Sequence, residues 1–91
     1  MMQLIWTVAA RRKRASAIEY IAQESLRAAF NQLNEIDLQT DRLLSHPNMG
    51  RPGKLRGTRE LVIRHTPFIV VYRVTADTVQ IVRFLHSAQN R

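Results

Sequence analysis

A histidine near the end of the chain is the first candidate for chemistry. His86 lies at the predicted end of the last strand, where a side chain can face a cleft. A histidine that transfers a proton, helped by cations that stabilise the developing charge, could cleave a phosphodiester. The cations that could serve are Arg59, Arg73 and Arg83, with Lys54 and Arg56 closing from a loop. The alternative is a structural histidine hydrogen-bonded at the end of the sheet, and the residue types alone favour it.

No strong catalytic or metal-binding motif accompanies this histidine. The chain has no cysteine, and His46, His65 and His86 stand far apart in the sequence. There is no nucleophile elbow and no His/Glu metal signature. We therefore expect no metal and no cofactor.

Charge is unevenly distributed along the sequence, whose formal net charge is +7. Residues 1–16 carry four bases and no acid, residues 17–46 carry five acids and two bases, and residues 51–91 carry eight bases and two acids. Such asymmetry favours a polyanion or an acidic protein as the partner of the two basic segments. The other interpretation, a solubilising surface, is the weaker one for a domain this small.

Two strands joined by a tight turn are the elements that must position these side chains. Residues 68–74 and 79–85 are rich in β-branched and aromatic side chains, and residues 75–78 have turn character. Both faces of the first strand are largely apolar, which is typical of a strand covered on both sides. We expect this hairpin in the middle of the sheet, with one face on the chain's own helices and the other available to a partner.

Two helices are predicted before this hairpin, after a short strand over residues 3–6. Thr7 can cap the first helix, which should run to about Glu24. Ser25 can cap the second helix, which should end shortly before Pro47. The expected apolar stripe of the second helix comprises Leu26, Ala29, Phe30, Leu33, Ile36, Thr40, Leu43 and Leu44. This stripe must bury against the sheet, since nothing else in the chain can cover it.

A loop rich in glycine and proline, residues 47–57, leads to a further strand over residues 58–64. The element order is therefore β-α-α-β-β-β. We predict an α+β fold in which a helical hairpin packs on a small antiparallel sheet. The length predicts a single domain over residues 1–91.

The sequence also bears on location. No apolar run reaches the length of a transmembrane helix. Residues 1–14 are unlike a signal peptide, because their charge follows the short apolar run instead of preceding it. The lack of cysteine fits a reducing compartment, so we expect no membrane association and a cytoplasmic location.

Motifs spread over the whole chain resemble those of the RelE/ParE toxin superfamily. They are Trp6-Thr7-Val8-Ala9-Ala10, Ile18-Glu19-Tyr20-Ile21-Ala22, His46-Pro47-x-x-Gly50-Arg51-Pro52, Gly57-Thr58-Arg59-Glu60-Leu61, Val71-Tyr72-Arg73-Val74 and Leu85-His86-Ser87-Ala88-Gln89. The resemblance implies the toxin of a type II toxin–antitoxin pair, with a helical hairpin on an antiparallel sheet. It also implies an antitoxin that wraps the toxin with an acidic, partly disordered segment, and hence a toxin–antitoxin hetero-oligomer.

The superfamily contains two kinds of toxin with different targets. RelE-type toxins cut messenger RNA in the ribosomal A site, whereas ParE-type toxins poison DNA gyrase and are not nucleases. The RelE-type motif has an arginine three residues before the tyrosine of the central strand, where this chain has Ile69. The motif around Tyr72, with His86 in the last strand, is more similar to the ParE branch. Arg14 departs from both, because the family commonly has an acid there. The resemblance thus favours ParE-like gyrase inhibition, with ribosome-dependent mRNA cleavage as the alternative.

Two contact surfaces are expected. Contact with the target or with nucleic acid is expected at Arg51, Lys54, Arg56, Arg59 and Arg64. Antitoxin contact is expected at Val82 and Phe84, which would share one face of a last strand that has no fully polar side. A plain basic nucleic-acid-binding module would explain the charge but not the order of the motifs.

Overall fold

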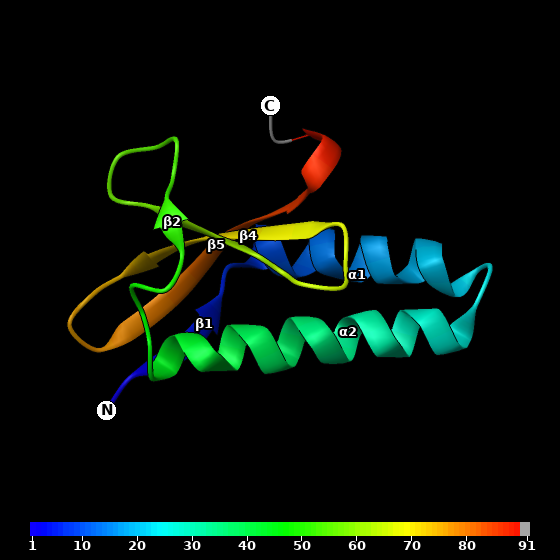
Figure 1. Ribbon diagram of the computed structural model, residues 1–91, viewed down its shortest axis with the longest axis horizontal. Coiled ribbons are helices and arrows are strands. Elements are labelled where there is room, and N and C mark those ends of the chain that lie inside the picture. Colours follow the sequence, from blue (N-terminus) through cyan, green and yellow to red (C-terminus); the bar gives the residue numbers. More distant parts are fainter. Residues whose placement is uncertain (90–91) are drawn as a thin grey trace.

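Runs of apolar residues with two different periods give residues 1–89 two α-helices and five strands, which form two layers (Figure 1). The computed structural model describes residues 1–89. The elements are β1 Gln3–Trp6, α1 Val8–Ala22, α2 Leu26–Asp41, the 3₁₀ turn η1 Arg42–Leu44, β2 Arg51–Pro52, β3 Arg59–Val62, β4 Phe68–Val74, β5 Thr78–His86 and the 3₁₀ turn η2 Ser87–Gln89. The predicted α+β class and the predicted element order are confirmed, with β2 as an additional short strand.

The sheet has the strand order β1-β5-β4-β3-β2, so the β4–β5 hairpin lies in its interior as predicted. Neighbouring strands are antiparallel except at one edge, where β1 runs parallel to β5 and Leu4 lies opposite Val79. The sheet is therefore mixed: the predicted antiparallel pairing holds for three of its pairs, and only the β1–β5 pair differs from it. Parallel strands need a long crossover connection, and the helical hairpin is part of the connection between β1 and the later strands.

A β-bulge in β5 changes which residues face the core. Arg83 lies opposite Val71, but Ile81 lies opposite Tyr72, so Val82 is the extra residue. Ile81 and Phe84 consequently both point into the core, where they are 0% and 4% exposed. The simple alternation expected for this strand, with Val82 and Phe84 on one face, was therefore wrong.

Side-chain caps fix the start of both helices. Thr7 Oγ1 accepts a hydrogen bond from the Ala10 amide at 3.1 Å, and Ser25 Oγ accepts one from the Ala28 amide at 3.1 Å. Both predicted caps are confirmed. The first helix ends at Ala22, two residues earlier than predicted, because the chain must extend again to place the Ser25 cap.

The core lies between the helices and one face of the sheet. From the predicted stripe of α2 and η1, the buried residues are Ala29, Ile36, Thr40 and Leu43. Leu26 and Phe30 were expected to widen this stripe, but they are 66% and 69% exposed. Figure 1 shows the reason: the turn between α1 and α2 extends beyond the end of the sheet. The start of α2 therefore has no strand to cover it.

The opposite face of the sheet also buries apolar residues. Ile69 and Val71 in β4 are each 4% exposed, although they do not belong to the core cluster under the helices. Both faces of β4 are thus covered within the chain itself over Phe68–Tyr72, whereas Arg73 and Val74 are exposed. In the described part of the chain, no helix is long and apolar enough to cross a membrane.

Candidate functional site

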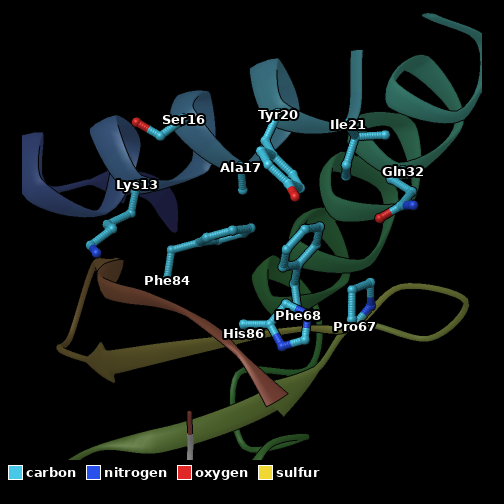
Figure 2. Close-up of a pocket in the computed structure, with 10 residues that line it drawn as sticks. All are labelled: Lys13, Ser16, Ala17, Tyr20, Ile21, Gln32, Pro67, Phe68, Phe84 and His86. Atoms are coloured by element: carbon cyan, nitrogen blue, oxygen red, sulfur yellow. The ribbon is translucent and has the colours of Figure 1, made fainter. Parts of the chain in front are cut away.

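His86 lies at the rim of a pocket where the helical hairpin meets the ends of β4 and β5. This pocket, called the helix-end pocket below, has a volume of about 400 Å³. It is lined by Lys13, Ser16, Ala17, Tyr20, Ile21, Gln32, Pro67, Phe68, Phe84 and His86. Figure 2 shows the rings of Tyr20, Phe68 and Phe84 grouped below α1, with His86 and Pro67 on the side of the strands. The pocket is therefore largely apolar, with one cation and a few polar groups around it.

His86 makes a ring contact and accepts a hydrogen bond beside the pocket. Its ring meets Phe68 edge-on, with the ring centroids 6.0 Å apart. The Ala88 amide donates a hydrogen bond to Nδ1 at 3.2 Å, so in this arrangement the neutral imidazole carries its proton on Nε2. Across the pocket, the Gln32 side-chain oxygen is buried and accepts no hydrogen bond from the described residues. The pocket thus holds a proton donor, an acceptor and the Lys13 ammonium group around apolar walls.

The arginines expected near His86 lie elsewhere. His86 is opposite Phe68, and Arg73 is five positions further along β4, about 17 Å away at the usual rise per residue. Arg83 is opposite Val71, on the face of the sheet away from the helices. The expectation that Arg73 and Arg83 lie near His86 was therefore wrong, because strand register and side-chain alternation separate these arginines from the histidine.

The side chain of Arg59 makes hydrogen bonds within the fold. It lies opposite Tyr72, and its Nη1 donates to the carbonyl oxygens of Gly50 at 2.8 Å and Asn48 at 3.4 Å. Tyr72 holds the same segment, because its hydroxyl donates to the Pro47 carbonyl at 2.7 Å and accepts from the Gly50 amide at 2.9 Å. These two side chains fasten the start of the 47–57 loop to the sheet.

The buried hydroxyl of Tyr72 explains why residue 50 is a glycine, and its burial affects its own pKa. A methyl group added at Gly50 would lie 2.7 Å from the Tyr72 hydroxyl and 2.7 Å from the Glu60 carbonyl, so only glycine fits. Burial raises the pKa of Tyr72 above its ordinary value of 10.0, although the Gly50 amide and the Arg59 charge oppose the rise. Tyr72 therefore remains a neutral hydrogen-bond donor at physiological pH.

Glu60, on the strand that pairs with the start of this loop, has its negative charge balanced by an arginine. Glu60 is 5% exposed, and its Oε1 accepts from Arg51 Nη2 at 3.0 Å and Nε at 3.2 Å. The positive charge of Arg51 is thus balanced by Glu60 across the β2–β3 pair. Of the predicted contact residues, Arg51 contributes little net charge to the surface.

Three other cations gather at the same end of the sheet. Lys54 and Arg56 are exposed on the loop, and the guanidinium of Arg73 lies beside it, with Nη1 3.4 Å from where a Gly57 methyl would be. We call Lys54, Arg56 and Arg73 the loop-end surface. Figure 1 shows this loop projecting from the sheet on the side away from the α1–α2 turn. Arg73 therefore lies beside the loop that carries the predicted contact residues Lys54 and Arg56.

Arg64 does not join this surface. It follows β3 at the opposite end from Arg59, where its amide donates to Gln39 Oε1 at 2.7 Å and its carbonyl accepts from Gln39 Nε2 at 2.9 Å. The paired hydrogen bonds tie α2 to the sheet, and the exposed side chain of Arg64 lies near the β3–β4 turn. The contact residues predicted as one set are thus divided between two ends of the molecule.

The two residues expected to contact an antitoxin also differ in exposure. Phe84 is 4% exposed, and its ring packs on Phe68 at 4.8 Å and on Trp6 at 6.3 Å. It is a core residue whose edge lines the helix-end pocket, whereas Val82 is half-buried at the bulge. A partner can therefore reach only the small exposed edge of Phe84, which lines the helix-end pocket and a smaller pocket beside Ala9 and Ala10.

Several side chains of the candidate site were missed from the sequence. Lys13, Tyr20 and Gln32 come from two helices, and only their packing against β4 and β5 shows that they share a pocket. Tyr72 could have been found, because a hydroxyl within an apolar strand requires a buried partner. Arg14, which stands where the family commonly has an acid, lies over the Trp6 ring at 4.2 Å. Among the described residues, no group of three or more His, Cys, Asp or Glu could hold a metal ion.

Comparison with known sequences gives two matches over most of the chain. The profile of the family described as "ParE toxin of type II toxin-antitoxin system, parDE" matches residues 4–91. The Sinorhizobium fredii protein named "Putative toxin Y4kP" is 36% identical over 84 residues, which are 92% of this chain and 86% of that protein.

Comparison with solved structures extends the likeness to the fold. The chromosomal ParDE TA system from P. aeruginosa gives a TM-score of 0.83 at 27% identity, covering 94% of this chain and 96% of that chain. YafQ from E. coli strain BL21(DE3) gives 0.65 at 11% identity, covering 97% and 96%. The E. coli DinJ–YafQ toxin–antitoxin complex gives 0.62 at 12% identity, covering 96% and 93%. The two likenesses to YafQ concern the fold alone.

Proposed function

The chain belongs to the ParE toxin family of type II toxin–antitoxin systems, and from this premise we propose that it arrests bacterial growth by inhibiting DNA gyrase. In this proposal the toxin acts by binding, and it breaks no phosphodiester bond itself. The target is expected in the cytoplasm, where the toxin would act.

One observation carries the proposal: the side chains that a nuclease would need are not together. His86 lies at the helix-end pocket, Arg73 is about 17 Å away along β4, and Arg59 holds backbone carbonyls. General acid–base catalysis requires the proton-transfer group within hydrogen-bond reach of the reacting atoms, with cations placed on the same phosphate. Ile69, where the nuclease branch has an arginine, is 4% exposed and cannot replace that charge.

The comparisons give independent support for the gyrase branch. The likeness to the P. aeruginosa ParDE system has both the higher TM-score and the higher identity of the structures compared, 0.83 and 27% against 0.65 and 11% for YafQ. The matched family profile carries the ParE description as well.

A second candidate function, ribosome-dependent mRNA cleavage, is favoured by the exposure of His86. Its ring is at the rim of a pocket that also holds Lys13, and in the neutral state it carries a proton on Nε2. A histidine with a neighbouring ammonium group could protonate a leaving oxygen. This candidate would need a ribosomal component to supply the phosphate-binding cations that are distant here.

The proposed partner in the cell is a cognate antitoxin with an acidic, partly disordered segment. The helix-end pocket offers apolar walls, including the edge of Phe84, while Lys13 can meet a carboxylate and Gln32 Oε1 lacks a donor in the described chain. Val82, the extra residue of the β5 bulge, lies two positions before Phe84. An antitoxin segment with an apolar side chain for the pocket would form a toxin–antitoxin hetero-oligomer.

Growth assays with one substitution separate the two candidate functions. The chain is induced with and without its antitoxin, and gyrase-dependent DNA breaks and ribosome-dependent mRNA cuts are measured separately. We expect growth arrest, DNA breaks, rescue by the antitoxin, and nearly unchanged toxicity for His86→Ala. Cuts in mRNA by the wild type that vanish in a folded His86→Ala variant would establish the second candidate instead.

A further inference from the structure

The loop-end surface carries positive charge that the described chain leaves unbalanced. Within residues 1–89, Lys54, Arg56 and Arg73 form no ion pair, and Glu60 on the neighbouring strand β3 is buried against Arg51. All three side chains are exposed, so they are open to an anionic ligand from solution.

The backbone that carries these cations is fixed by hydrogen bonds at both ends. At its start, Tyr72 and Arg59 hold the segment from Pro47 to Gly50. At its end, the Gly53 amide donates to the Thr58 carbonyl at 2.8 Å, and Thr58 Oγ1 donates to the Leu55 carbonyl at 2.6 Å. Gly57 has a φ of 79°, a left-handed turn that brings the loop back against Arg73. The cations are therefore presented on an ordered turn, which lowers the entropy lost when a ligand binds.

We propose that the loop-end surface binds the phosphate backbone of duplex DNA directly. Regularly spaced phosphates can meet several cations at once without needing an apolar cavity. An acidic peptide would gain most of its affinity from apolar anchors, and the helix-end pocket that could receive them is at the other end of the sheet. The inference rests on the proposed function for its biological ligand, the DNA held by gyrase, but the binding itself is measured without gyrase.

The expected salt dependence of DNA binding follows from three phosphate contacts, one for each cation. Each contact contributes about −0.9 to the slope of log affinity against log salt, so three predict a slope of about −2.7 and an affinity loss of roughly 40-fold between about 50 and 200 mM salt. Replacing Lys54 and Arg56 by glutamine leaves one contact and a slope of about −0.9.

Fluorescence anisotropy with a short fluorescein-labelled DNA duplex tests the proposal on the full chain. The variant Lys54→Gln/Arg56→Gln is compared with Arg27→Gln/Arg42→Gln, which removes the same charge from exposed positions on α2 and η1. Circular dichroism and urea midpoints establish that both variants are folded. We expect the first variant to lose most of the salt slope and the second to retain it.

Three results would overturn the inference. One is an equal loss of slope in both double variants, since this would mean that net charge alone attracts DNA. Another is poly-L-glutamate displacing the duplex as effectively as unlabelled DNA does. The third is tighter binding of a single-stranded RNA of equal length. If DNA binding fails while purified gyrase is still inhibited, only this inference falls; if DNA binds but gyrase is unaffected, only the proposed function falls.

Discussion

Replacing Tyr72 by phenylalanine should lower the free energy of unfolding by about 2 kcal/mol, because the lost hydroxyl leaves a buried donor unsatisfied. The ring would remain in place, so no large cavity forms. The buried Gly50 amide would lose its acceptor at 2.9 Å, which costs about 1–3 kcal/mol. The Pro47 carbonyl, which accepts from the hydroxyl at 2.7 Å, is only half-buried and can regain water at lower cost.

Urea denaturation measures this effect. With a dependence of about 1–2 kcal/mol per M for a small domain, the midpoint should fall by about 1–2 M. Tyr20→Phe is the matched control, because Tyr20 is 73% exposed and its change should stay within about 0.5 kcal/mol. Hydrogen exchange should also quicken selectively at the Gly50 amide in the Tyr72 variant. Equal midpoints for wild type and Tyr72→Phe, with Gly50 exchange unchanged, would show that the hydroxyl does not hold the loop.

Three further outcomes follow from the same contacts. Gly50→Ala should destabilise the protein by more than about 2 kcal/mol, as its methyl group would collide with the Tyr72 hydroxyl and with backbone; thermal unfolding checks this, and a wild-type melting temperature would contradict it. Ile36→Ala, at a fully buried position, should cost about 2–5 kcal/mol in urea denaturation, whereas Leu38→Ala on the exposed side of α2 should cost under about 0.5; similar losses would refute the assigned core. Because the folded pKa of Tyr72 lies above 10.0, the unfolded chain loses that proton first, so the contribution of Tyr72 to stability should be constant below pH 10 and then be lost as the pH rises; a steeper alkaline loss in Tyr72→Phe than in the wild type would contradict this.

The local parts of the fold could be predicted from the sequence. The β-branched and aromatic run over Phe68–Val74 matches β4 as it stands in the structure, and Thr7 and Ser25 cap the helices as expected. These features depend on neighbouring residues, whose preferences are visible in the sequence. The parallel pairing of β1 with β5 and the two-residue strand β2 depend on contacts between distant segments, and no local pattern indicates them.

The candidate site was predicted less well, for a related reason. The basic residues of the 47–57 loop were identified by their type, but the type could not tell which cations have partners. Arg51 pairs with Glu60 and Arg59 with loop carbonyls, while Lys54 and Arg56 have no ion pair among residues 1–89. The bulge at Val82 moved Phe84 into the core, a shift that strict alternation cannot anticipate.

The most direct test of the central claim is a cleavage assay with purified gyrase, supercoiled plasmid and this toxin, without ribosomes. If the chain is a ParE-like inhibitor, the fraction of protein-linked, cleaved plasmid should rise with toxin concentration. That rise should disappear when the antitoxin is added and should persist in His86→Ala. An unchanged plasmid at toxin concentrations that cut mRNA on ribosomes would contradict the account.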